Sequence, residues 1–577
     1  MSVRHSSIAI MLLLASLLGA CTPAAPAPAV APDQSAAAAT TVAPTAAAET
    51  AQPTAVESAP VPAEPTAAPA AEVPTAAPAR GGIFVRAMTS EPATIDPQGA
   101  PSSGLSLVLP YLFDTLVVRD TDNSLLPLLA ESWDVAPDGK TITMTLRSDV
   151  VFHDGEPLTA DTVRLTFERF KESGKKSPIY GGVRQISGID AADDLTVRFT
   201  FDEPAANFWS TISMPYAGIL SPASIAQSAA EPATRLVGTG PFTLGDWQTG
   251  QSMTLVRNED YAWGPALNEN RGAPYLDQLV FKVIPDATTQ LAALEAGEVD
   301  VIFINQPDHL ARLQQSDDVR LHEAVLNSLI YLGFNTQKAP FDDARVRQAL
   351  AHAVNKDEIL SLALGGVGIK AFAPLPPTLP GFDESLAEHE LGFDPAASAS
   401  LLDEAGFAQG SDGTWQRDGQ ALKAVLLTST RAPNDAIAAL VQSQLKAVGV
   451  EVEIQQLDSK AVMEATTAGN FDLLVWRYDW NDPDALNIYL GSDRIGSTNR
   501  VAYGNPAVDD LLGRGARELD EATRQQLYVE AQKLILADAP WQPLYVPLDV
   551  IAISTRIEGA RAGYMGRLLV NDAYVVE

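Results

Sequence analysis

The sequence predicts an α/β protein with at least two lobes. The clearest sign is the segment 424–476, in which apolar strand-like runs alternate with stretches of helical periodicity. Strands joined by helices in this way are parallel, with right-handed crossovers. The second sign is length. From Gly81 onward the chain has about 500 residues, more than the roughly 250–300 at which a single core stops growing.

Hydrophobic periodicity and capping residues place individual elements of this part of the chain. Alternate residues are apolar in Lys140–Arg147, which predicts a half-buried strand. Thr159 and Asp286 each precede a pattern of helical spacing and are expected to be N-caps. In the second half, Asp342 is expected to cap one helix and Asn434 to begin another.

Residues 1–20 have the order of a secretory signal peptide. Arg4 and His5 give a basic start, Ile8–Leu18 is apolar, and small residues follow. The apolar run is shorter than the ~20 residues that a membrane-spanning helix requires. A membrane-anchoring helix is the alternative interpretation. We expect the segment to direct export and to be removed.

Cys21 is the only cysteine of the chain and directly follows this segment. The sequence Leu18-Gly19-Ala20-Cys21 resembles a bacterial lipobox, which implies acylation of the Cys21 thiol and cleavage before it. Two or three acyl chains anchor a protein far more firmly than one. With one cysteine, the mature chain forms no internal disulfide. Cys21 is therefore the expected lipid anchor.

Residues 21–80 are predicted to be a lipid-anchored, disordered tether. Ala, Pro and Thr dominate this segment, and large apolar residues are almost missing. Such a composition cannot bury enough surface to offset the entropy of the chain. Its many prolines favour extended conformations. The folded part would thus be held outside the cytoplasmic membrane, in the periplasm or at the cell surface.

Composition and motifs argue against several classes of function. The net charge of −33 argues against nucleic acid, whose phosphates require Lys and Arg. The six histidines are scattered without a zinc spacing, and the sequence has no Walker or Gly-x-Ser-x-Gly motif. Gly238–Pro241 superficially resembles a phosphate loop, but it precedes an expected strand, which favours a tight turn. No catalytic residue, metal site or cofactor is predicted.

A candidate binding site follows the last strand of the α/β run. Ligands of open α/β sheets bind beyond the carboxyl ends of the strands. Asp479 stands at this position, with Trp476, Tyr478 and Trp480 beside it. The aromatic rings would exclude water and strengthen an ion pair with a ligand cation. A solvated loop carboxylate is the alternative.

The next acidic residues are assigned to the start of a helix. Asp482 precedes Pro483, as an N-cap residue often precedes a proline at the first helical position. Asp484 would then interact favourably with the helix dipole. A calcium loop is not supported, because the glycine and glutamate that it requires are missing.

Four sequence blocks stand in a fixed order along the chain. They are Ala130–Asp134 with Pro137–Lys140 and Val151–Val163, Val237–Phe242 with Arg257–Tyr261, Gly333–Thr336 with Pro340–Asp343 and Arg345–Leu350, and Asn499–Tyr503 with Asn505–Asp509. Together, these blocks resemble the dipeptide/oligopeptide/nickel family (family 5) of extracytoplasmic solute-binding proteins of ABC importers. The resemblance extends from about Gly81 to the C-terminus. It implies a two-lobed periplasmic-binding-protein fold of type II, with an extra subdomain and a ligand cleft between lobes that crossing strands connect.

The resemblance also implies a division into lobes. Lobe I would comprise residues 81–325 and 548–577, with the extra subdomain at about 99–224. Lobe II would comprise residues 326–547. His153, which belongs to the first block, would lie in a structural turn rather than in a catalytic site.

For the site, the resemblance implies a role for the Trp-x-x-Asp motif, which matches residues 476–479. Asp479 would pair with the α-ammonium group of a bound peptide, and Trp476, Tyr478 and Trp480 would surround it. Some oligopeptide binders carry an arginine just before this motif, near the peptide carboxylate. Residues 471–475 contain none, so the partner of a ligand carboxylate stays unassigned.

The implied function is binding rather than catalysis. The chain would be a monomeric lipoprotein that captures a peptide or related small solute and delivers it to an ABC permease and ATPase complex. Nickel, another metal chelate or an oligosaccharide are alternative ligands within the family. A secreted hydrolase is the alternative of another class, and the missing nucleophile and metal motifs argue against it.

Overall fold

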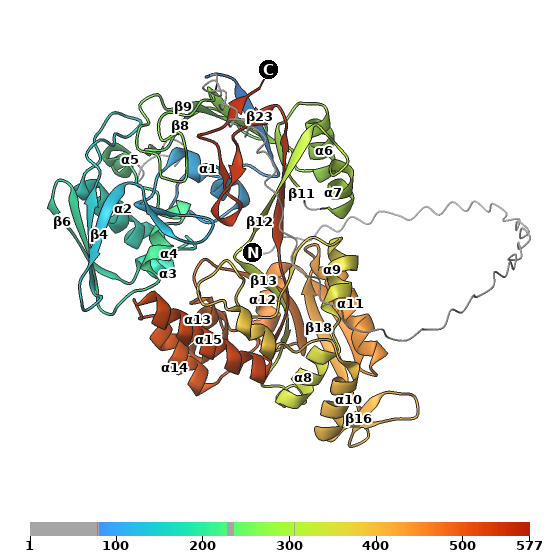
Figure 1. The fold of residues 1–577 in the computed structure, drawn as a ribbon. Coiled ribbons are helices and arrows are strands. Elements are labelled where there is room, and N and C mark those ends of the chain that lie inside the picture. Colours follow the sequence, from blue (N-terminus) through green and yellow to red (C-terminus); the bar gives the residue numbers. More distant parts are fainter. Residues whose placement is uncertain (1–77, 79, 228–235, 305, 577) are drawn as a thin grey trace, which may run out of the picture. The chain divides into compact units, whose positions relative to one another are not determined.

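The computed structural model describes residue 78 and residues 80–227, 236–304 and 306–576. The predicted signal peptide, Cys21 and nearly all of the tether lie outside the described residues. Among the helices of the described part, none combines the length and the apolar character needed to cross a membrane. Two large mixed sheets organise this part of the chain, and the predicted α/β class is confirmed (Figure 1).

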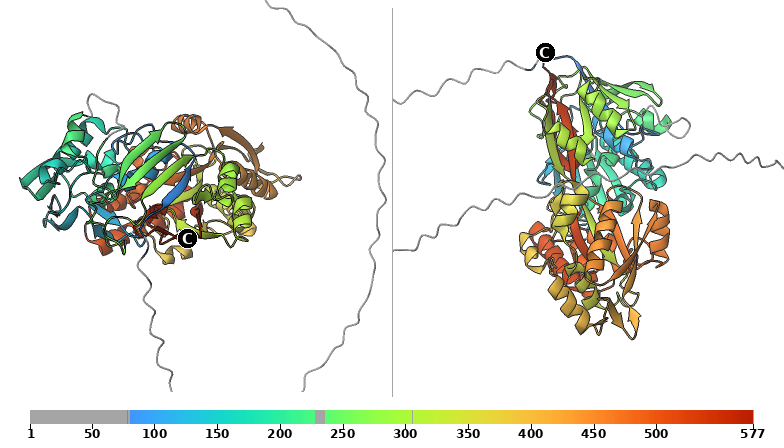
Figure 2. Two further views of the ribbon diagram at one scale, coloured as in Figure 1. Left: turned by 90° about the horizontal axis from the view of Figure 1, so that it is seen from above. Right: turned by 90° about the vertical axis from the view of Figure 1, so that its right-hand side faces the viewer.

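The first large sheet has seven strands and draws on distant parts of the chain. Strand β1 is parallel to its two neighbours, whereas the remaining pairs are antiparallel. Figure 2 shows the blue N-terminal strand beside green strands from the middle of the chain. In order across the sheet, the strands are β12 (Val319–Val325), β22 (Leu548–Ser554), β11 (Val301–Ile304), β1 (Ile83–Met88), β10 (Gln278–Val283), β9 (Ser252–Arg257) and β8 (Phe242–Gln248).

The second large sheet has six strands and contains the predicted α/β run. Strand β18 is parallel to both β19 and β20, and helices α11 (Asn434–Ala447) and α12 (Ser459–Thr467) connect them, so this prediction is confirmed. Strand β20 pairs antiparallel with β13 on its other side. In order, the strands are β14 (Ile369–Lys370), β21 (Trp541–Val546), β13 (Ser328–Phe334), β20 (Leu473–Asp479), β18 (Lys423–Ser429) and β19 (Glu451–Leu457).

The chain passes between the two large sheets twice. It leaves β12 at Val325 and enters β13 at Ser328, and it leaves β21 at Val546 and enters β22 at Leu548. We therefore propose the division stated above as the lobes of this protein: residues 81–325 and 548–577 are called lobe I, and residues 326–547 are called lobe II.

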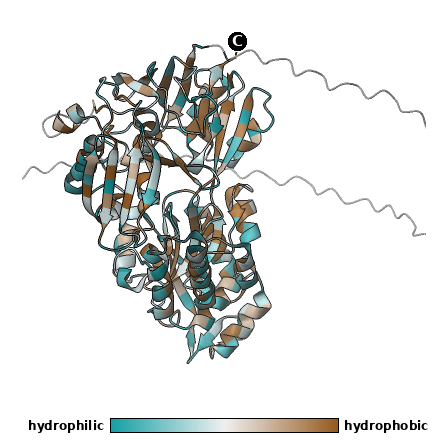
Figure 3. Ribbon diagram, turned by 60° about the vertical axis from the view of Figure 1, so that its left-hand side comes forward, coloured by the Kyte–Doolittle hydropathy of each residue, from teal (hydrophilic) through white to brown (hydrophobic). Residues whose placement is uncertain are grey.

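A smaller antiparallel sheet lies within the segment 99–224, where the extra subdomain is expected. Its strand β5 (Thr141–Leu146) has Ile142, Met144 and Leu146 buried, so the predicted half-buried strand is confirmed. The alternation of apolar and polar residues along strands is visible in Figure 3. The other strands of this sheet are β4 (Ala130–Val135), β7 (Thr196–Phe201) and β6 (Ile186–Asp193), and helices α2 (Ala160–Ser173) and α4 (Phe208–Ile212) accompany it.

Buried apolar residues form separate cores in the two lobes. The largest cluster belongs to lobe I and includes Phe167 and Phe199. In lobe II both faces of the sheet are covered: Leu332 of β13 belongs to one cluster, whereas its neighbour Tyr331 belongs to another with Trp541. Successive residues of a strand face opposite sides, so both faces of β13 are apolar.

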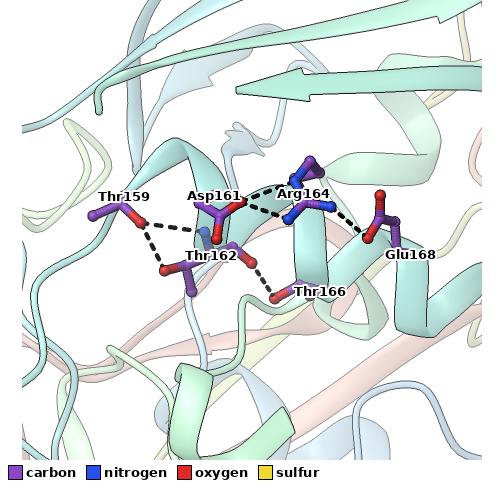
Figure 4. Close-up of polar contacts among 6 residues, drawn as sticks. All are labelled: Thr159, Asp161, Thr162, Arg164, Thr166 and Glu168. Atoms are coloured by element: carbon purple, nitrogen blue, oxygen red, sulfur yellow. Dashed lines mark hydrogen bonds and ion pairs between the residues drawn. The ribbon is translucent and has the colours of Figure 1, made fainter. Parts of the chain in front are cut away.

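The cap of α2 forms as predicted, through Thr159. Its Oγ1 accepts a hydrogen bond from the backbone N–H of Thr162 at 3.2 Å (Figure 4). Further along the helix, Arg164 donates to Asp161 and to Glu168, at spacings that stabilise an exposed helix face. The hydroxyl group of Thr159 thus satisfies one of the free amides of the first turn.

Two further predicted helix starts are confirmed. Asp286 accepts from the Thr289 N–H at 2.8 Å at the start of α6 (Ala287–Glu295), and α11 begins at Asn434. The cap assigned to Asp342 is wrong by one residue. Asp343 precedes α8 (Ala344–His352), and its extended backbone directs its carboxylate to the Arg345 N–H at 2.9 Å.

The Gly238–Pro241 segment is a structural turn that leads into β8. The His153 ring contacts the Gly240 carbonyl oxygen at 2.9 Å, and the His153 N–H donates to the Gly238 carbonyl at 3.0 Å. Thr239 donates its hydroxyl to the buried carboxylate of Asp114. These contacts hold the turn at His153 against the Gly238–Pro241 segment, so two of the family-like sequence blocks pack together.

Candidate ligand-binding site

A cavity of about 900 Å³ is lined by residues of both lobes. Lobe I contributes β11, helix α7 (Pro307–Leu313) and β22. Lobe II contributes β20, α12, helix α9 (Lys356–Leu364) and the loop between β18 and α11. Much of the lining is apolar and includes Ile304, Leu310, Ile330, Leu364, Met463 and Tyr545.

Asp479 is the last residue of β20 and lines this cavity. Arg477 donates from Nε to Asp479 Oδ1 at 2.7 Å, and its Nη2 donates to the same oxygen. The two side chains lie on one face of the strand because they are two residues apart. The Asp479 side chain is 54% exposed. Its Oδ2 has no hydrogen-bond partner among the described residues, so it is available to a ligand.

The other predicted ligand residues divide between the cavity and the adjacent core. Trp476 lines the cavity, and the guanidinium group of Arg500 lies 5.6 Å from its ring. Tyr478 is 2% exposed, stacks on Trp541, and donates its hydroxyl to a backbone carbonyl. Trp480 packs against the same cluster as Tyr478. The structure thus brings Asp479 and Trp476 to the cavity, whereas Tyr478 lies in the adjacent core and the half-buried Trp480 packs against that core.

Arg431 also lines the cavity, although it was not among the predicted site residues. It lies two residues beyond the carboxyl end of β18, and its side chain is exposed. No acidic residue of the described part forms an ion pair with it. The rule that places ligands beyond the carboxyl ends of parallel strands applies to β18 as it does to β20. Applied to both strands, it would have found Arg431.

Asp549 of β22 adds a carboxylate to the cavity from lobe I. Burial raises the pKa of Asp549, whereas the positive charges of Arg477 and Arg86 lower it. Arg86 does not line the cavity; it is buried and stands 4.7 Å from the Phe303 ring centre. The cavity therefore presents charged groups of both signs on an apolar lining.

The predicted helix start at Asp482 is wrong. Helix α13 (Ala485–Leu490) begins later, and Asp484 is the residue before it. Asp482 is buried instead, and its carboxylate accepts from Ser210 at 2.8 Å, from Arg524 at 2.7 Å and from the backbone N–H of Asp484 at 2.9 Å. Asp482 therefore combines one local contact with two partners that lie far away in the sequence, and no local pattern predicts those two.

The buried carboxyl group of Asp484 has an unusual environment. Burial, and next the negative charge of Asp482, raise the pKa of Asp484 to about 7. The positive charges of Arg524 and Arg494 oppose this shift. One of its oxygens, Oδ1, is buried and has no hydrogen-bond partner among the described residues.

We expect Asp484 to make stability depend on pH. An unfolded aspartate has a pKa near 4. The folded protein therefore holds this proton more tightly, and the resulting stability is complete below about pH 4 and is lost as the pH rises through about 7. Asp484→Asn should remove this contribution. Urea unfolding of both proteins from pH 4 to 8 should show the wild type losing stability relative to the variant; parallel curves would contradict the prediction.

Comparisons with known proteins agree with this architecture. Residues 124–497 match the model of bacterial extracellular solute-binding proteins, family 5 Middle. Heme-binding protein A of Haemophilus influenzae is 32% identical over 75% of this chain and 81% of its own length. Di/tripeptide-binding protein 2 of Pseudomonas aeruginosa is 31% identical over 77% of this chain and 85% of its own.

Solved structures show the same fold. HbpA2 from Haemophilus parasuis is 25% identical, with a TM-score of 0.75 over 86% of this chain and 100% of that chain. The dipeptide binding protein from Pseudoalteromonas sp. SM9913, in complex with Met-Leu, is 26% identical, with a TM-score of 0.69 and the same coverage. The chain therefore belongs to family 5 of the bacterial extracellular solute-binding proteins, which serve ABC importers.

Proposed function

We propose that this protein captures short peptides outside the cytoplasmic membrane and delivers them to an ABC permease. The observation that carries the proposal is the presence of Asp479 and Arg431 in one largely apolar cavity. A peptide has an ammonium group, a carboxylate group and side chains between them. Asp479 would receive the ammonium group, and Arg431 the carboxylate group.

The size and lining of the cavity support a small ligand. Its volume of about 900 Å³ lies within the ~300–1,000 Å³ range of small-molecule sites. Di/tripeptide-binding and dipeptide-binding proteins stand among the relatives. Because two lobes line the cavity, a ligand that contacts both would favour their approach.

The lipid anchor belongs to the same proposal. The order of a basic start, an apolar run, small residues and Cys21 supports it, together with the Pro-rich tether that follows. Anchored in this way, a monomeric binding protein would stay close to its permease while the tether lets it move. The extracytoplasmic location of the family agrees with such an anchor.

Mass spectrometry of the ligand that co-purifies with the protein, followed by calorimetry, tests the proposed function. We expect dipeptides or tripeptides in the extract. Their dissociation constants should lie near the micromolar range, which corresponds to a binding free energy of about −8 kcal/mol. Ni²⁺, heme and an oligosaccharide mixture serve as the alternative ligands. Binding of one of these, with no heat from any peptide, would overturn the peptide assignment and leave the family membership intact.

Arg431→Gln is expected to weaken the binding of peptides with a free carboxylate by roughly tenfold, because a hydrogen bond to a charged group contributes about 1.5–3 kcal/mol. Peptides with an amidated C-terminus should bind both proteins alike. Arg514→Gln is the matched control, since Arg514 is exposed on α14 (Pro506–Gly515) and does not line the cavity. An equal loss for free and amidated peptides would contradict the assignment of Arg431.

A further inference from the structure

A buried polar contact joins the lobes next to the candidate site. Ser210, in α4 of lobe I, donates its hydroxyl to Asp482 Oδ2 of lobe II at 2.8 Å. Asn481 Nδ2 donates to the Ser210 carbonyl oxygen at 2.6 Å. Ser210, Asn481 and Asp482 are all buried. We call these three residues the interlobe contact.

The two carboxylate oxygens of Asp482 have partners in different lobes. Oδ2 accepts from Ser210 of lobe I, whereas Oδ1 accepts from Arg524 Nη2 at 2.7 Å, from helix α15 (Glu521–Asp538) of lobe II. On the lobe I side, Arg119 Nη2 donates to Ser210 Oγ at 3.2 Å. Charged hydrogen bonds in a buried setting are stronger than those in water. Asp482 thus belongs to lobe II through an ion pair and reaches lobe I through one hydroxyl.

The interlobe contact is continuous with the candidate site through the backbone. Asp479, which lines the cavity, precedes Asn481 and Asp482 by only two and three residues. The Trp480 N–H donates to the Asn327 carbonyl at 3.0 Å, where the chain crosses between the large sheets. Asn327 Nδ2 donates in turn to the Tyr564 hydroxyl of lobe I at 2.7 Å. One hydrogen-bonded segment, residues 479–482, therefore contains both Asp479 of the candidate site and two residues of the interlobe contact.

We propose that Asp482 is a positioning residue that retains the ligand without touching it, by holding the lobes together through Ser210. Separation of the lobes removes Ser210 from Asp482, and their approach around a ligand restores the bond. If the ligand binds the closed form better, each bond that stabilises this form raises the apparent affinity and slows release. The inference rests on the proposed function for its ligand and on the observed contact for its geometry.

Ser210→Ala removes the hydroxyl and keeps the backbone carbonyl that Asn481 uses. With the dipeptide Met-Leu as the probe, we expect a 3- to 10-fold higher Kd, nearly all of it in the dissociation rate. Ser400→Ala is the matched control, because Ser400 is an exposed helical serine whose hydroxyl donates to Glu404 within its own helix α10 (Pro395–Glu404). The thermal midpoint of the ligand-free protein should change little.

A double-mutant cycle with Asp482→Asn distinguishes loss of the bond between Ser210 and Asp482 from unrelated effects of each substitution on the fold. If the two side chains act through their mutual bond, the second substitution should add little to the effect of the first on the dissociation rate. Additive effects, or an unchanged dissociation rate in Ser210→Ala, would overturn the proposal.

Hydrogen exchange of the ligand-free protein provides a readout that needs no peptide. In Ser210→Ala, the backbone amides of residues 480–482 should exchange several-fold faster than in the wild type, because the lobes separate more often. If the wild type binds no peptide, the proposed function is wrong, but hydrogen exchange still tests whether the bond between Ser210 and Asp482 holds the lobes together. Unchanged exchange would overturn the role of Asp482 in holding the lobes.

Discussion

Replacing Asp479 by alanine is expected to weaken the binding of peptides with a free α-ammonium group on the order of 100-fold, which corresponds to about 2.8 kcal/mol. The substitution removes the carboxylate whose Oδ2 is open to the cavity. It also leaves Arg477 without its hydrogen-bonded carboxylate, so the cavity becomes more positive beside the ligand cation. Both effects oppose an ammonium group, and truncating one member of a ligand ion pair costs several kcal/mol in comparable interfaces.

The measurement is calorimetry with matched peptides. N-acetylated peptides carry no ammonium group, so their affinity should respond much less to Asp479→Ala. Asp493→Ala is a suitable control, because Asp493 is an exposed aspartate outside the cavity lining, with an adjacent arginine as its ion-pair partner. Equal affinity of wild type and variant for free peptides would contradict the role of Asp479 and leave the binding function standing.

Asp300→Ala is expected to cost about 1.5–3 kcal/mol of the free energy of unfolding, because it removes a buried carboxylate that accepts charge-assisted hydrogen bonds from a half-exposed arginine. Asp300 is 1% exposed and precedes β11. Its carboxylate accepts from the Val85 N–H at 2.7 Å and from Arg556 at 2.6 and 2.8 Å. It therefore ties three distant parts of lobe I together: β1, β11 and the segment after β22.

Urea unfolding checks this prediction, with Glu298→Ala as the control. Glu298 lies two residues away, but its ion pair with Lys282 is exposed on both sides, so its loss should cost less than about 1 kcal/mol. If Asp300→Ala also cost less than 1 kcal/mol, the carboxylate would not hold the discontinuous lobe together. The variant that remains folded should bind peptides normally, because Asp300 does not line the cavity.

Local signals predicted the elements that depend on local chemistry. The strand at 140–147 was predicted from the alternation of apolar residues, and the run from β18 to β20 from apolar strands that alternate with helical periodicity. Thr159 and Asp286 were found because a cap bonds to amides two or three residues away. The error at Asp342 has the same origin, since two adjacent aspartates compete for one position and backbone geometry chooses between them.

The candidate site was only partly predictable. Asp479 was found because it ends a buried strand, and Trp476 because it precedes Asp479 within the motif. Tyr478 lies in the core because neighbouring residues of a strand face opposite sides. Arg431 is close to Asp479 only because β18 and β20 are parallel neighbours in the sheet, although the residues are far apart in sequence.

The sequence by itself determined the α/β class, the β-α-β-α-β run from β18 to β20 in lobe II, and the carboxylate at the end of β20. Periodicity, capping and strand ends act over a few residues, and a single chain displays them. Only the tertiary structure decided that Asp479 and Arg431 share a cavity with Asp549 of the other lobe, and that Asp482 bonds to Ser210. Charged groups act across space on whatever the fold brings near them, so their partners cannot be read from their neighbours in the chain.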